Sequence, residues 1–293
     1  MVQMNRTDTL SAILLVAMVA LSLPALFGLP WSITIVLLIL YVLTLTAFGL
    51  LHGSQTLGIR GVLVFFILST MTTYGMEWLG THLGIPFGHY YYTEQMGPML
   101  MGVPLIIPLQ WFNMMYPSYI MVTVILSGRK RGAAPGVGEN KLPLSRYVLI
   151  RMAAASLLAG LVMVSWDFIN DPYMVAVGMW VWTNPAEFFG LMLFGIPISN
   201  FLGWVLSSAL AVFLFEAVSH GTGFGSETAD SNTPKSHLFL VLVPYLYALV
   251  YQAASGLSAG IFSFVSVGEW GPIALAAAGM VFAAALVLRK RDI

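Results

Sequence analysis

Long apolar segments dominate the chain and recur along its whole length. Eight of them are close to the length that an α-helix needs to cross the hydrocarbon of a bilayer, about 20 residues. The polar positions gather in the connections between them. The pattern predicts an all-α, polytopic membrane helix bundle with about eight spans, at residues 10–28, 31–51, 62–80, 99–126, 146–168, 199–217, 237–256 and 272–288.

Two stretches need a separate interpretation. The first apolar segment runs into the second with no polar stretch between them, so we expect a span there rather than a cleaved signal peptide. The stretch 170–198 is apolar, but Pro172, Pro185 and Pro197 interrupt it. Because proline disrupts a helix interior, we expect the fifth helix to end near Pro172 and the stretch to be re-entrant or interfacial.

The basic residues fall on one side of this eight-span arrangement. Eleven of the 12 Lys and Arg residues lie in the two terminal segments or in the three loops that share a side with them. The twelfth, Arg151, lies about one turn inside the fifth span on the same side. Loops rich in Lys and Arg remain in the cytoplasm. We therefore expect a multi-pass protein of the cell membrane with both termini cytoplasmic.

Composition narrows the class of protein further. Only 8% of the residues are charged and the formal net charge is zero, whereas soluble domains carry about 25% charged residues. This balance excludes a soluble enzyme and a nucleic-acid binder. The chain has no cysteine, so thiol catalysis, iron–sulfur clusters and Cys-bound zinc are excluded, and its five histidines form no di-iron cluster. We expect neither a metal nor a cofactor.

Two segments, 62–126 and 146–217, share four features in the same order. Each has a carboxylate beside a tryptophan, an aromatic stretch, a Gly-x-Pro motif and a second tryptophan. Both would enter the membrane from the same side, which predicts a parallel repeat about an axis along the membrane normal. The chain would be one integral membrane domain, 1–293, with flanking spans in 10–51 and 237–288. The features are Glu77, 88–93, 102–104 and Trp111 in one segment, and Asp167, 178–183, 195–197 and Trp204 in the other.

Three acidic residues within or beside the spans are candidates for catalysis. An ionisable residue inside a membrane span is costly and therefore indicates a function. Glu77 and Asp167 hold matching positions in the repeat, and Asp171 shares a helix face with Asp167 if the helix continues that far. A protonated carboxyl beside an ionised one can act as an acid–base pair. The alternative is that these groups only join the two repeat units by hydrogen bonds.

Aromatic residues are dense around these acids. Their faces could line a slot for a flat apolar chain and stabilise a carbocation, although an interfacial aromatic belt would explain part of them. Asn113 and Asn200 could position water or join helices. His89 could shuttle protons or simply face the surface. The candidates for substrate binding are His89, Tyr90, Tyr92, Trp111, Asn113, Trp180, Trp182, Asn200 and Trp204.

Taken as a block, these motifs resemble a known family. Glu77-Trp78, the run Gly84–Thr93 and the segment from Trp166-Asp167 to Trp204 are similar to the carotenoid biosynthesis membrane protein family, of the bisanhydrobacterioruberin hydratase and γ-carotene/lycopene 1,2-hydratase type. The resemblance covers about residues 60–220. It implies an acyclic C40 or C50 carotenoid as substrate, within membrane lipid and alongside other enzymes of the pathway. It also implies that water adds across the terminal double bond to give a tertiary alcohol.

The candidate residues fit this reaction independently. Protonation of an alkene needs a strong, desolvated acid, and a second carboxylate can orient and deprotonate the water. Asp167 or Glu77 would be the proton donor and the other the base, with Asp171 and Asn200 in support. Two alternatives remain open: a carotenoid cyclase or isomerase that uses the same protonation, and a proton-coupled lipid or carotenoid carrier that performs no chemistry.

Overall fold

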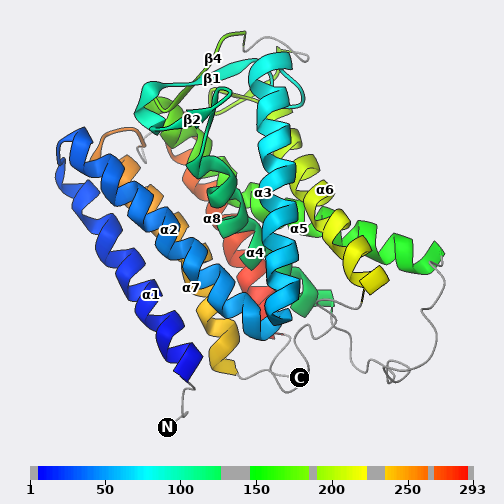
Figure 1. The fold of residues 1–293 in the computed structure, drawn as a ribbon. Helices are drawn as coiled ribbons and strands as arrows, with labels where there is room; N and C mark the ends of the chain where they lie inside the picture. Colours follow the sequence, from blue (N-terminus) through cyan, green and yellow to red (C-terminus); the bar gives the residue numbers. More distant parts are fainter. Residues whose placement is uncertain (1–5, 127–145, 185–189, 223–234, 263–266, 290–293) are drawn as a thin grey trace, which may run out of the picture.

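The computed structural model describes residues 6–126, 146–184, 190–222, 235–262 and 267–289 (Figure 1). Eight α-helices account for most of these residues. They are α1 (Arg6–Ser22), α2 (Trp31–Thr56), α3 (Gly58–Leu83), α4 (Ile106–Leu126), α5 (Arg146–Ala176), α6 (Ile198–Thr222), α7 (Lys235–Ser258) and α8 (Val267–Arg289). The short elements are η1 (Leu23–Phe27), β1 (Tyr90–Tyr92), η2 (Glu94–Met96), β2 (Met99–Leu100), β3 (Val103–Pro104), β4 (Trp180–Trp182), β5 (Met192–Leu193) and β6 (Ile196–Pro197).

The predicted all-α membrane bundle is confirmed. Six of the described helices, α2, α3 and α5 to α8, are long and apolar enough to cross a membrane. Helix α1, with 17 residues, and α4, which contains Gln110, Asn113 and Pro117, are not among them. The count of eight spans therefore stays a prediction.

The strands gather at one end of the bundle, and α1 begins and α8 ends at the other (Figure 1). Four arginines mark helix ends away from the strands. Arg6 begins α1, Arg60 lies in the first turn of α3, Arg146 begins α5 and Arg289 ends α8. The described part of the chain thus separates a basic end from an aromatic end.

The segments 62–126 and 146–217 fold with the same order of elements. In the described residues, each runs from a long helix through a strand and a two-residue hairpin to a returning helix, and the first segment also has η2 between its strand and its hairpin. The hairpin turns place Met101 and Gly102, and likewise Phe194 and Gly195, at positive φ. Positive φ at both central residues is the geometry of a tight hairpin and explains the glycine of each Gly-x-Pro motif. The predicted span 99–126 therefore began too early, because its first residues form the hairpin and α4 begins only at residue 106.

Strands β1 and β4 join the two segments by reciprocal hydrogen bonds. The Thr93 amide donates to the Met179 carbonyl at 2.9 Å, and the Thr183 amide donates to the His89 carbonyl at the same distance. Reciprocal contacts between equivalent positions are the signature of a local two-fold axis. The antiparallel pairs are Tyr90 with Trp182, Tyr91 with Val181 and Tyr92 with Trp180.

Helix α5 continues one turn beyond Pro172, so the prediction that it ends there was wrong. Proline removes one helical hydrogen bond, but neighbouring helices hold this turn from outside. Asp171 accepts a hydrogen bond from Asn200 of α6, and Asn170 accepts one from Gln252 of α7. The rest of the stretch 170–198 forms strands in its described part, while residues 185–189, with Pro185, lie outside the described residues.

Candidate active site

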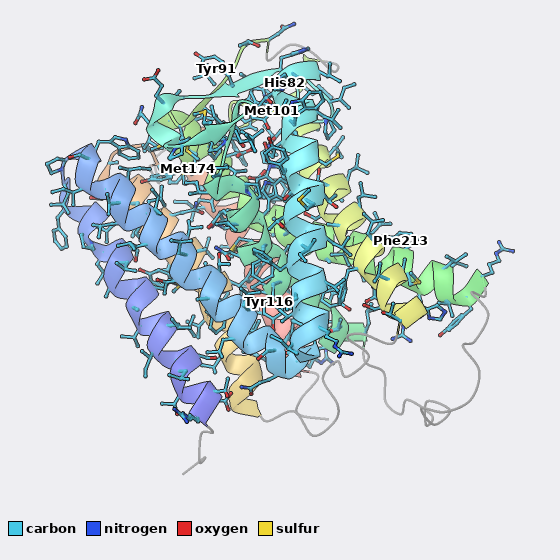
Figure 2. All side chains as sticks on the ribbon, viewed as in Figure 1. His82, Tyr91, Met101, Tyr116, Met174 and Phe213 are labelled. Atoms are coloured by element: carbon cyan, nitrogen blue, oxygen red, sulfur yellow. The ribbon has the colours of Figure 1, made fainter. Side chains whose placement is uncertain are left out.

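A cavity lies at the strand end of the bundle, enclosed by α2 to α7 with β1 and β4. Its empty volume is about 960 Å³, including a part that is open to the outside. Met174 on its wall lies just beneath the strands, whereas Tyr116 lies toward the opposite end (Figure 2). No Lys or Arg occurs among the described residues that line the cavity. The cavity is therefore mainly apolar, with a few carboxyl and amide groups on its wall.

Glu77, on α3, is held by three hydrogen-bond donors. The Tyr90 and Tyr92 hydroxyls donate to its Oε2, the latter at 2.8 Å, and Trp111 Nε1 donates to its Oε1 at 2.8 Å. Side chains two apart on a strand share a face, which is why Tyr90 and Tyr92 both reach Glu77 while Tyr91 is exposed (Figure 2). Both oxygens of the buried Glu77 carboxyl thus act as acceptors.

The two tyrosines remain donors under ordinary conditions. Burial, followed by the nearby charge of Glu77, raises the pKa of the Tyr90 and Tyr92 hydroxyls well above the ordinary value. Each phenol therefore keeps its proton. Strand β1 lies outside the helices, so its register sets the position of both donors relative to Glu77.

Asp167 and Asp171 form a second acidic group, on α5. Because α5 is continuous, they lie on one helix face, and Asn200 Nδ2 donates to Oδ2 of both, at 3.3 Å to Asp167. Asp171 lines the cavity, whereas Asp167 is fully buried behind it. Asp167 Oδ1 accepts no hydrogen bond from the described residues. The two carboxyls therefore share the Asn200 amide as a donor.

An aromatic wall faces the cavity. Trp111 and Trp204 stack at a centroid distance of 4.0 Å, and the Trp166 ring meets Trp204 edge-on at 5.7 Å. Pairs of rings across β1 and β4 extend this wall to the strands. These rings line a space whose described wall has no basic side chain, and aromatic rings attract cations.

Comparison with known proteins shows the family to which the chain belongs. Residues 32–282 match the family described as "Carotenoid biosynthesis protein". The chain belongs to this family. A stretch of 148 residues is 31% identical to bisanhydrobacterioruberin hydratase from Haloarcula japonica, which is 50% of this chain and 42% of that protein. The match thus spans less than half of the relative's length, and no solved structure matches the chain.

The match to the carotenoid biosynthesis family includes the whole cavity. Every residue that lines it lies within 32–282, including those on α2 and α7, which are outside the two repeat segments. Several of these lining residues are polar and were not singled out from the sequence. They are Tyr41, Gln110, Asn170, Tyr251 and Gln252. Their only sequence signal is a polar group within an apolar run.

Most of the predicted site residues lie together, but three do not line the cavity. Asn113 donates to the Val42 carbonyl at 3.1 Å and accepts from Thr46 at 2.9 Å, so it joins α4 to α2. His89 is half-buried with its ring beside Gly84. Asp167 is connected to the site only through Asn200 and Asp171. The residues that do line it are Glu77, Tyr90, Tyr92, Trp111, Asp171, Trp180, Trp182, Asn200 and Trp204.

Proposed function

We propose that this chain is a carotenoid hydratase. It adds water across the terminal trisubstituted double bond of an acyclic C40 or C50 carotenoid and gives a tertiary alcohol. The observation that carries the proposal is one apolar cavity that combines buried carboxyls, aromatic faces and amides, in a member of the carotenoid biosynthesis family. The name of the partly matching relative, a hydratase, supports the same reaction.

The Asp167–Asp171 pair is the proton donor, acting through Asp171. Two buried carboxyls that share one donor cannot both ionise without strong repulsion, so the pair retains a proton. Asp171 is the member that reaches the cavity. Its proton passes to the less substituted carbon of the double bond, and the electron pair of that bond forms the new C–H bond. A tertiary carbocation remains on the other carbon.

Glu77 and the aromatic wall stabilise this cation. In the proposed reaction Glu77 is ionised, the form that its three fixed donors favour, and a preorganised charge acts strongly on developing charge. The faces of Trp111 and Trp204 add the attraction of their π systems. Glu77 is therefore the counter-charge to the cation.

Water completes the addition. Its oxygen bonds to the tertiary carbon, and its surplus proton returns to the Asp167–Asp171 pair. The acid is regenerated, one water is consumed and no redox step occurs. The amide groups on the cavity wall favour hydration over cyclisation, since they give water a place beside the cation.

The substrate reaches this cavity from the membrane. We place the basic helix ends and both termini in the cytoplasm, following the distribution of Lys and Arg. The cavity then lies in the non-cytoplasmic half of the bundle. A long apolar carotenoid would remain in lipid while its acyclic end enters the site.

Expression in a host that makes acyclic carotenoids tests the proposal. The chain would be expressed with and without a C50 elongation enzyme, and the pigments would be analysed by mass spectrometry. A product heavier by one or two waters supports the hydratase and identifies its substrate. A product of unchanged mass with a shorter absorption wavelength would indicate a cyclase. Unaltered pigment with normal amounts of the chain in the membrane would indicate a carrier.

A further inference from the structure

Two amide side chains form a polar wall beside the acid pair. Gln252 of α7 donates from Nε2 to Asn170 Oδ1 at 2.6 Å, and both side chains line the cavity while being at least 95% buried. Asn170 directly precedes Asp171 on α5. The amide pair therefore lines the same cavity as Asp171, the group that donates the proton in the proposed reaction.

The Gln252 side chain has one polar atom to spare. Its Oε1 is buried and has no hydrogen-bond partner among the described residues. Exchanging the two amide atoms does not change this conclusion, because Asn170 can satisfy only the atom that faces it. Buried polar atoms without a protein partner are normally satisfied by water. The spare atom thus leaves one hydrogen bond of the cavity-lining Gln252 side chain for a water molecule to complete.

The polar wall is confined to one side of the local two-fold axis. With the offset of 90 residues that relates Glu77 to Asp167, Asn170 corresponds to Gly80 and Asp171 to Thr81. The α3 side therefore carries the counter-charge without an equivalent amide and acid. Gln252 comes from α7, outside both repeat segments. The first segment contributes a cavity-lining amide at a different place, Gln110 of α4, and has no counterpart of the Asn170–Gln252 pair.

We propose that Gln252 and Asn170 hold the water that attacks the carbocation, and so direct the enzyme toward hydration. This inference rests on the proposed function. Water held by Gln252 shares the cavity with Asp171, which takes back its proton after the C–O bond forms. Without the held water, the cation loses a proton from a neighbouring carbon to the same acid pair and returns to an alkene. Gln252 is a positioning residue, whereas protonation of the alkene does not require it.

Reaction in D₂O separates these two steps. Protonation followed by loss of a proton leaves deuterium in an alkene, whereas capture by water gives a deuterated alcohol. Membranes that contain wild-type chain, Gln252→Met or Gln252→Glu would be incubated with an acyclic carotenoid. Both products would be quantified by mass spectrometry. Ser255→Ala, one turn along α7 and away from the cavity wall, is the matched control.

We expect Gln252→Met to lower the amount of alcohol about tenfold or more, as misplacing a reactant does, while deuterium still enters the alkene. Gln252→Glu keeps an oxygen acceptor and should retain more alcohol than Gln252→Met. Ser255→Ala should match wild type. The inference is overturned if Gln252→Met makes alcohol at the wild-type rate, or if a well-expressed Gln252→Met loses exchange and alcohol together. A wild-type chain that makes no alcohol with any acyclic carotenoid would instead contradict the proposed function.

Discussion

The indole rings of Trp111 and Trp204 stack with their centroids 4.0 Å apart and their planes inclined by 16°. They hold corresponding positions on the two returning helices, so the stack lies where the two segments meet. Only Trp111 also donates to Glu77. The two tryptophans are thus equivalent in packing and different in polar contacts, which allows their roles to be separated.

Trp111→Phe and Trp204→Phe should therefore have unequal effects. Both changes keep an aromatic ring in the stack, but Trp111→Phe also removes a donor to a buried carboxylate. A hydrogen bond to a charged group contributes about 1.5–3 kcal/mol, so we expect Trp111→Phe to be roughly tenfold or more slower than Trp204→Phe. Initial rates of alcohol formation at matched protein levels test this, and equal rates would contradict the role of Glu77.

Removing the charge of Glu77 should slow the reaction without unfolding the chain. Glu77→Gln retains an oxygen acceptor but loses the counter-charge to the cation. Loss of a preorganised electrostatic contact typically costs about 10²–10³ in rate. Glu94→Gln is the matched control, because Glu94 is exposed and does not line the cavity. A Glu77→Gln chain with wild-type turnover would exclude the proposed counter-charge.

The acid pair predicts an order among its own variants. Asp171→Asn removes the carboxyl that reaches the cavity and should lower the rate about 10²–10⁴-fold, the usual contribution of a general acid. Asp167→Asn leaves that carboxyl in place and should retain more activity. The measurement is product formation in isolated membranes with the amount of chain determined by immunoblot. The reverse order would show that Asp167 is the donor.

Gly160 on α5 should allow α5 and α6 to pack closely. A Cβ at Gly160 would lie 2.6 Å from the backbone carbonyl oxygen of Val205 on α6, so the helices would have to separate. Forced overpacking costs about 1–3 kcal/mol, and Gly160→Ala should lower the unfolding temperature in detergent. Gly75→Ala, where no atom lies within 4 Å of the new Cβ, is the control and should leave it unchanged or higher. Equal unfolding temperatures would show that α5 and α6 adjust at no cost.

The sequence predicts the helices well because their apolar length alone indicates them. Glu77, Asp171 and the tryptophans were also identifiable, since charge and aromatic density are unusual inside spans. The end of α5 was not identifiable from the sequence. The tendency of Pro172 to end the helix is overridden by hydrogen bonds to α6 and α7, which no local pattern reveals.

The rotation of each helix about its own axis was the harder problem. Asn113 and Asn200 look alike in the sequence, yet one joins α4 to α2 and the other binds the acid pair. Lipid and protein interior are both apolar, so hydrophobic periodicity does not distinguish the faces of a span. Gln252 was missed as well. Its hydrogen-bond partner, Asn170 on α5, lies in a distant part of the chain, so no local pattern points to the contact.

Incubation of the purified chain with an acyclic carotenoid in ¹⁸O-labelled water tests the central claim most directly. We expect an alcohol in which each new hydroxyl carries the label, formed by the wild-type chain and almost absent with Asp171→Asn. An alcohol whose oxygen is unlabelled, or labelled alcohol at the wild-type level from Asp171→Asn, would contradict acid-catalysed hydration at this site.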